Sequence, residues 1–178
     1  MGANYLKPTV RGYREGDTIQ RYLRVEVASK LFGYTEEQII SIAYAAAAVD
    51  FSRTMRVAMF GNNMRDVAVT DGDRVESEIH FGWNVNYYGI GDLVRIKNEL
   101  DSSDIDSQMK EYQEKYALAT DNLDAVREQA ATELALTKFL EKEHIHAFTD
   151  TFQDLHGLRQ LPGLAVQDLM ARGLSFAP

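Results

Sequence analysis

The fold is decided by residues 55–88, which read MRVAMFGNNMRDVAVTDGDRVESEIHFGWNVNYY. Within them, Met55–Phe60 is a short apolar run that ends at Gly61, as a buried β-strand does. A helix is expected over Asp73–Phe81, because its first residue can cap it, and Trp83–Tyr88 is the next strand candidate. A strand, a helix and a second strand in this order predict a right-handed β-α-β unit, in which the two strands are parallel.

The same alternation continues on both sides of this unit. Strands that alternate with helices of about ten residues or more are typical of a parallel sheet with helices on both faces. We therefore predict an α/β fold with a doubly wound, mainly parallel sheet. The further strands expected are Tyr22–Ala28, His146–Phe152 and Leu174–Phe176. Five further helices are expected: one that runs through Val49 and is capped by Thr35 and Gln38, one capped by Asp92, one opened by Asp101, one over Asn122–Glu143 and one over Gly163–Arg172.

The composition limits the classes of function. The 178 residues suit one domain, and we expect a loose arm over residues 1–18 before a single α/β domain over residues 19–178. The 27 acidic residues outnumber the 19 Lys and Arg, and no basic run occurs, so neither nucleic acid nor an anionic membrane is an expected partner. The longest apolar run, Ile39–Val49, is too short to span a bilayer, and Cys is absent. A soluble cytoplasmic protein is the simplest expectation.

Two turns have both a chemical and a structural interpretation. The segment Gly89-Ile-Gly91-Asp-Leu-Val94 follows a strand and opens a helix, as a dinucleotide-binding turn does. Val94 stands where that fingerprint needs a third glycine, which favours an ordinary turn. The step Asp71-Gly-Asp73 lacks the remaining ligands of a calcium loop, so a turn with a helix cap is favoured there as well.

Histidines supply the other candidates. His144 and His146 would face one side of a strand and could bind a metal, with Glu143 and Asp150 as the nearest further ligands. No recognised spacing links these four residues, so surface or half-buried histidines are favoured. The segment Asp154-Leu-His156 could be an acid–base pair, but no serine or threonine nucleophile stands in a recognisable elbow, which favours a role in satisfying backbone groups.

The position of a binding site follows from the fold. Ligands of such sheets bind beyond the carboxyl ends of the strands, which points to the loops Gly61–Arg65, Tyr88–Asp92 and Phe152–Gln160. Met64 and Phe152 are apolar residues of these loops. By themselves they are more often core or loop hydrophobes than parts of a pocket wall.

The same loops lie in long, information-rich stretches. These are Phe60-Gly-Asn-Asn-Met-Arg-Asp-Val-Ala-Val-Thr-Asp-Gly-Asp73, Phe81-Gly-Trp-Asn-Val-Asn86, Gly89–Val94, Thr151-Phe-Gln-Asp-Leu-His-Gly157 and Leu161-Pro-Gly-Leu-Ala-Val166. Together they resemble the central domain of L-arabinose isomerase, in order, from about Arg56 to Pro178, whereas residues 1–50 match poorly. The resemblance implies a Rossmann-like domain.

The resemblance also implies an activity. Members of that family interconvert L-arabinose and L-ribulose, and many convert D-galactose to D-tagatose. The expected chemistry uses a divalent metal, usually Mn²⁺, that holds two substrate oxygens, and a carboxylate that moves a proton between neighbouring carbons. By the same resemblance, Met64 and Phe152 are substrate-binding residues that line the sugar site, and the protein is a homo-oligomer, a trimer or hexamer.

One departure from the family pattern bears on activity. In family members the stretch that matches Leu174-Ser-Phe-Ala177 runs into Glu-Gly-Asp-Trp, whose glutamate is a metal ligand and a catalytic carboxylate; here Pro178 is the last residue. We therefore expect a fragment or truncated form that carries no catalytic residue or metal ligand, binds no Mn²⁺ and is inactive alone. The alternatives are a stand-alone sugar- or nucleotide-binding module that uses the strand-end loops, and an assembly part with an exposed apolar face.

Overall fold

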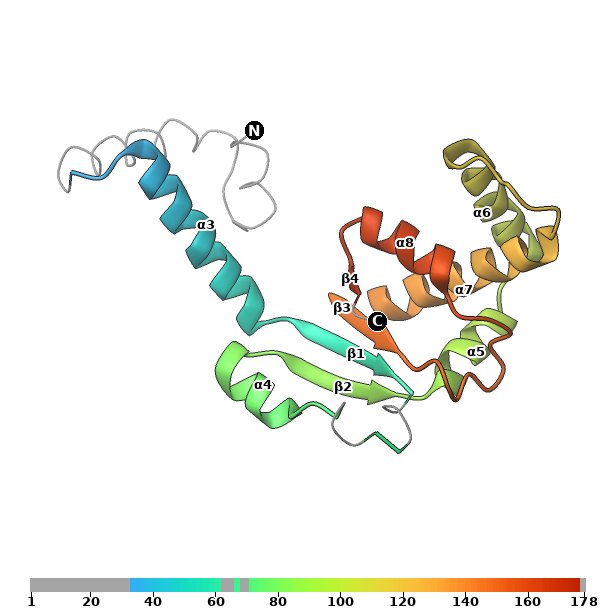
Figure 1. The fold of residues 1–178 in the computed structure, drawn as a ribbon, viewed down its shortest axis with the longest axis horizontal. Helices are drawn as coiled ribbons and strands as arrows, with labels where there is room; N and C mark the ends of the chain where they lie inside the picture. Colours follow the sequence, from blue (N-terminus) through green and yellow to red (C-terminus); the bar gives the residue numbers. More distant parts are fainter. Residues whose placement is uncertain (1–32, 62–65, 68–70, 177–178) are drawn as a thin grey trace. The chain divides into compact units, whose positions relative to one another are not determined.

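The computed structural model describes residues 33–61, 66–67 and 71–176 (Figure 1). The chain divides into two compact units, Met1–Thr54 and Met55–Pro178. In the first unit one helix is described, α3 (Glu36–Arg53), which has the predicted capping box but continues beyond the predicted end and has no buried residue. The predicted strand Tyr22–Ala28 and the predicted arm over residues 1–18 lie outside the described residues.

The second unit contains a parallel sheet of four strands, which confirms the predicted α/β fold class. The strands are β1 (Arg56–Phe60), β2 (Asn84–Tyr88), β3 (Ala147–Asp150) and β4 (Ser175–Phe176), in the order β2-β1-β3-β4. From β1 the chain first moves outward to β2, and then returns past β1 to β3 and β4. This reversal makes the sheet doubly wound and puts its switch point between β1 and β3.

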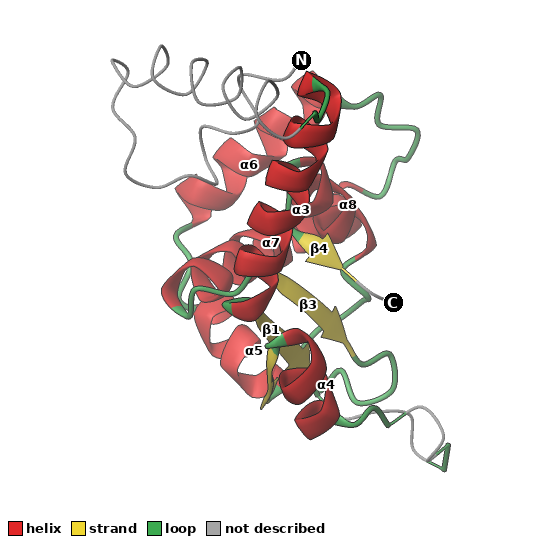
Figure 2. Ribbon diagram, turned by 90° about the vertical axis from the view of Figure 1, so that its left-hand side faces the viewer, coloured by secondary structure: helices red, strands yellow, loops and turns green. Residues whose placement is uncertain are grey.

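The helices that connect these strands lie on both faces of the sheet. Among the described elements, α4 (Arg74–Phe81) is the one helix between β1 and β2, whereas the helices after β2 cross in the opposite direction along the sheet. Right-handed connections therefore place α4 on the face opposite the others. Figure 2 shows the short strands among these helices, which are α5 (Ile90–Asn98), α6 (Ser102–Lys115), α7 (Leu123–Lys142) and α8 (Gly163–Ala171) besides α4.

The main core lies on the face that α5, α7 and α8 cover. Ala58 and Phe60 of β1 and Phe148 of β3 point into it and are almost fully buried. The ring of Phe60 meets the edge of Phe139 from α7, with 5.0 Å between the ring centres. The opposite face has less cover, since α4 has no buried residue and leaves Val75 and Ile79 exposed. Most of the apolar stabilisation of the second unit therefore comes from one face of the sheet.

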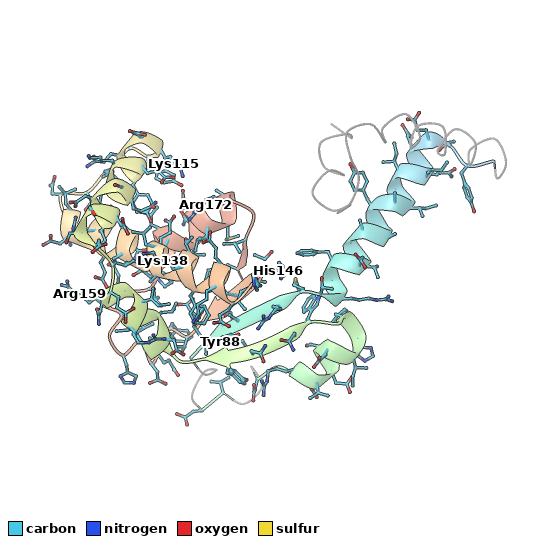
Figure 3. The ribbon with its side chains drawn as sticks, turned by 180° about the vertical axis from the view of Figure 1, so that it is seen from behind. Tyr88, Lys115, Lys138, His146, Arg159 and Arg172 are labelled. Atoms are coloured by element: carbon cyan, nitrogen blue, oxygen red, sulfur yellow. The ribbon has the colours of Figure 1, made fainter. Side chains whose placement is uncertain are left out.

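A buried polar network fixes α6 and α8 to α7. The hydroxyl of the fully buried Tyr112 donates to the carboxylate of Glu133, which also pairs with Arg172. Tyr116 and Lys115 donate to the carboxylate of Asp168, at 2.7 and 3.3 Å (Figure 3 labels Lys115 and Arg172). Because these carboxylates are almost inaccessible to water, their partners replace the hydration that burial removes.

One predicted cap is wrong. Asp92 does not cap α5, because the cap position is Gly89, whose carbonyl accepts a hydrogen bond from the Asp92 amide at 3.0 Å. Asp92 thus lies inside the first turn, where its negative charge still favours the helix dipole. The cap predicted from Asp73 is present, and the structure adds a cap of α7 at Asn122.

No helix in the described part of the chain is both long enough and apolar enough to pass through a bilayer.

Candidate functional site

The carboxyl ends of β1 and β3 are held tightly together. Gly61 follows β1 with a φ of +78°, and its amide donates to the carbonyl of Tyr88 at 2.8 Å. The amide of Thr151 donates across to the carbonyl of Phe60 at 2.9 Å. A Cβ on Gly61 would lie 2.4 Å from Cγ2 of Thr151, so both the backbone angle and the close approach require glycine here. This contact fixes the place where the loops after the two strands leave the sheet.

A cavity of about 480 Å³ opens beyond the ends of β3 and β4. Its wall is largely apolar and comes from both strand ends and from the segment that opens α8. A volume of this order suits a small molecule, and the carboxyl edge of a parallel sheet is where such sheets bind ligands. The side chains that line it include Asp150, Phe152, Leu161, Val166, Gln167 and Phe176.

Phe152, predicted to be a substrate-binding residue, lies in the wall of this cavity. Its side chain is 53% exposed, so a bound molecule could cover it. It does not belong to β3, which ends at Asp150, two residues before the predicted end of the strand. Met64, the other predicted substrate-binding residue, lies outside the described residues. A role in substrate binding stays a prediction for both.

Asp150 gives the cavity its one acidic group among the lining residues. Its Oδ2 atom is buried and has no hydrogen-bond partner within residues 33–61, 66–67 and 71–176. Burial raises the pKa of this carboxyl to about 6, against an ordinary value of 3.8, and a hydrogen bond from the backbone acts weakly the other way. The sequence suggested Asp150 only as a further ligand beside histidines. The signal for its actual place is the two-residue period from the core residue Phe148, which puts both on one face of β3.

The rim of the cavity is fixed from α7 by one side chain. Gln129 is buried, and its Nε2 atom donates to the carbonyl of Leu161 at 2.8 Å. Its Oε1 atom accepts from the amides of Leu164 and Ala165, at 3.0 and 3.2 Å. Because Pro162, the N-cap of α8, makes no side-chain cap hydrogen bond, Gln129 satisfies the amides that the helix start leaves free.

Comparison with known proteins identifies the family. A family model of the L-arabinose isomerase central domain matches residues 56–178, the span of the resemblance found in the sequence. The chain belongs to the L-arabinose isomerase family. The matched stretch contains all four described strands and the whole lining of the cavity.

Individual L-arabinose isomerases are similar over the same region. That of Clostridium beijerinckii is 46% identical over 160 residues, which cover 86% of this chain and 33% of that relative. This match is longer than the stretch 56–178, so it also includes residues that precede Arg56. Those of Shouchella clausii and Salmonella arizonae are 49% and 50% identical over 127 and 131 residues, or 71% and 70% of this chain, and in both cases 26% of the relative. The chain thus spans about a quarter to a third of these relatives' length.

The histidine pair considered for a metal does not share a strand face. His144 follows α7 in a turn with a φ of +54°, and His146 precedes β3 and accepts from the amide of Arg56 through Nδ1, at 3.2 Å. His146 lies at the opposite end of the strands from Tyr88 (Figure 3), whereas Asp150 is at the far end of β3. Nowhere in the described part of the chain do three or more His, Asp or Glu side chains form a group that could hold a metal. The donors among the described residues therefore do not fit the Mn²⁺ that the sequence resemblance implies.

The glycine turn at the start of α5 serves packing. Ile90 and Leu93 are buried in the main core. A Cβ on Gly157 would lie 2.9 Å from both γ carbons of Val94, so the residue at the position of the third glycine is in close contact with the loop that follows β3. This close packing favours the ordinary turn over a dinucleotide-binding one.

The remaining polar candidates have structural partners. His156 is 86% exposed in its side chain, and its Nε2 atom lies 3.7 Å from Oδ1 of Asp154, which describes a surface ion pair. Asp71 accepts a hydrogen bond from the hydroxyl of Tyr87 at 3.1 Å, and Asp73 caps α4. Both acidic residues thus have the turn and cap roles that the sequence favours.

Proposed function

We propose that this chain supplies the scaffold and part of the substrate-pocket wall of an L-arabinose isomerase. The reaction interconverts L-arabinose and L-ribulose, with D-galactose and D-tagatose as a second pair. One observation carries the proposal: the cavity at the carboxyl edge of the sheet, with Phe152 in its wall, lies within the stretch that matches the family's central domain.

The part of the chemistry that falls to this chain is binding. An aromatic side chain that is half exposed offers a flat apolar surface against which the C–H face of a sugar can pack. The apolar wall also excludes water from that face, which strengthens nearby polar contacts. In the family's reaction, Mn²⁺ stabilises the negative charge that develops on the substrate oxygens. Its ligands and the proton-transferring carboxylates come from segments of the family protein other than residues 56–178, and the isolated chain is inactive.

The setting of the intact enzyme is part of the same proposal. The enzyme acts in the cytoplasm as a homo-oligomer, in which neighbouring subunits complete each other's sugar sites. The poorly covered face of the sheet, with Val75 and Ile79 of α4 exposed beside it, supports such an assembly.

Three measurements on the purified chain test the proposal. Isothermal titration with MnCl₂ should show no tight stoichiometric binding, and an L-ribulose assay should show no turnover. Saturation-transfer NMR should show weak binding of L-arabinose and D-galactose to the chain, and none of NAD. Tight Mn²⁺ binding or isomerase activity would contradict the proposal that the metal ligands and catalytic carboxylates come from other segments. NAD binding without sugar binding would instead favour the nucleotide-binding module.

A further inference from the structure

Asp150 differs from the other buried carboxylates of the second unit. Glu133 and Asp168 have several donors each, from Tyr112, Arg172, Tyr116 and Lys115. The Asp150 residue is only half buried, but its Oδ2 atom is buried and has no donor anywhere in the described part of the chain. A buried oxygen without a partner costs stability, so its presence needs an explanation.

The surroundings of Asp150 indicate which kind of ligand could bind its unpartnered Oδ2 atom. It belongs to β3, and its side chain lines the cavity together with Phe152. Apart from Gln167, the other lining residues are apolar, and among the described residues the lining contains no basic side chain that could pair with the carboxylate. One acceptor in an apolar wall suits a ligand that offers both C–H surface and a hydrogen-bond donor. A metal ion would need further oxygen or nitrogen ligands, and an anion would be repelled.

We propose that Asp150 is a specificity-determining contact of the sugar site, which accepts a hydrogen bond from a hydroxyl of the substrate while the C–H face of the sugar packs on Phe152. This inference rests on the proposed function, because it assigns the ligand of the cavity to the sugar class. Above a pH of about 6 the carboxyl is ionised, and a charged acceptor makes the stronger hydrogen bond. The hydroxyl thus supplies the partner that the described part of the chain does not.

The test compares two probes that differ only in hydroxyl groups. L-arabinose offers donors to Asp150, whereas tetrahydropyran has a similar ring with none. Chemical-shift titrations of the ¹⁵N-labelled chain at pH 7.5 give the Kd of each probe. In the Asp150→Leu variant, the Kd of L-arabinose should rise about tenfold, the loss expected for a hydrogen bond to a charged acceptor in an open cavity. The Kd of tetrahydropyran should stay the same or fall.

Three further variants make the result specific. Asp150→Asn, which keeps the shape but not the charge, should weaken L-arabinose binding in the same direction and serves if the leucine variant does not fold. Asp154→Asn removes a carboxylate from the neighbouring surface loop and should change neither Kd. Phe152→Ala should raise the Kd of both probes, because it removes the apolar surface on which both pack.

The outcomes distinguish a failure of the role of Asp150 from a failure of the proposed sugar site. If L-arabinose binds both Asp150 variants as tightly as the original chain, but binds Phe152→Ala more weakly, the role of Asp150 is wrong and the sugar site stands. If Phe152→Ala also leaves the Kd of L-arabinose unchanged, or if L-arabinose causes no shifts near the cavity, the proposed sugar site is wrong too, and the inference with it.

Discussion

Replacement of Asp150 by asparagine should stabilise the protein at neutral pH and hardly change it in acid. Folding raises the pKa of this carboxyl from 3.8 to about 6, so between these values the native state binds more protons than the unfolded state. Stability contributed by the protonated form is therefore lost as the pH rises from about 4 through 6. Asparagine cannot ionise and does not suffer this loss.

The magnitude follows from the size of the shift. About two pKa units correspond to about 3 kcal/mol at pH 7.5, at about 1.4 kcal/mol per unit. Since Asp150 is only half buried, solvent screening reduces this to about 2 kcal/mol. At pH 4 the same difference in pKa destabilises the native state by about 0.5 kcal/mol or less. We therefore expect Asp150→Asn to be more stable by about 2 kcal/mol at pH 7.5 and by little at pH 4.

Urea unfolding, followed by the fluorescence of Trp83, measures this difference at both pH values. Asp168→Asn is the matched control with the opposite sign. Burial acts to raise the pKa of Asp168, but the hydrogen bonds from Tyr116 and Lys115 outweigh it and hold the pKa below its ordinary value. The control should therefore be destabilised at pH 7.5 and less so in acid. A stability change in Asp150→Asn that is the same at both pH values, or that is a loss at pH 7.5, would refute the reasoning.

Three substitutions test the packing around the site and the network. Gln129→Leu leaves the rim of the cavity and the start of α8 without partners, and should cost about 2–3 kcal/mol in urea unfolding. Gly61→Ala should lower the free energy of unfolding by about 2 kcal/mol or more. The control Gly91→Ala, which has open space around it inside α5, should be neutral or slightly stabilising. A loss of similar size in both variants would contradict the strain at Gly61. Tyr112→Phe removes a donor to Glu133, so it should lower the free energy of unfolding by about 1–3 kcal/mol and speed hydrogen exchange in α6. Unchanged stability and exchange would show that this hydrogen bond contributes nothing.

The sequence predicts the elements of this fold well where their signals are local. A cap needs only a few neighbouring residues, which is why the caps at Thr35 and Asp73 are predicted correctly. The helix and strand alternation likewise predicts a parallel sheet, because that topology follows from the order of elements along the chain. The family resemblance over residues 56–178 is confirmed for the same kind of reason, since it rests on contiguous motifs.

What the sequence does not predict depends on distant partners. Gln129 stands in the middle of a helix, and nothing nearby in the chain shows that it will hold the start of α8. Asp150 looks like one acidic residue at the end of a strand, and its unpaired oxygen is evident only once the cavity wall is assembled. Likewise, His144 and His146 fit one strand on paper, but α7 continues until just before the first of them.

The division of stabilising contacts explains how the site can hold an unpaired carboxylate. The main core around Phe60 and Phe148, and the network around Glu133, lie on the helix-covered face of the sheet and tie α6, α7 and α8 together. Gln129 and the contact at Gly61 brace the carboxyl edge. A loss of about 2 kcal/mol at Asp150 is a sizeable share of a typical net stability of about 5–15 kcal/mol, so the contacts elsewhere in the second unit must offset it. The edge can therefore keep a polar group unsatisfied for a ligand, because the elements that carry it are fixed elsewhere.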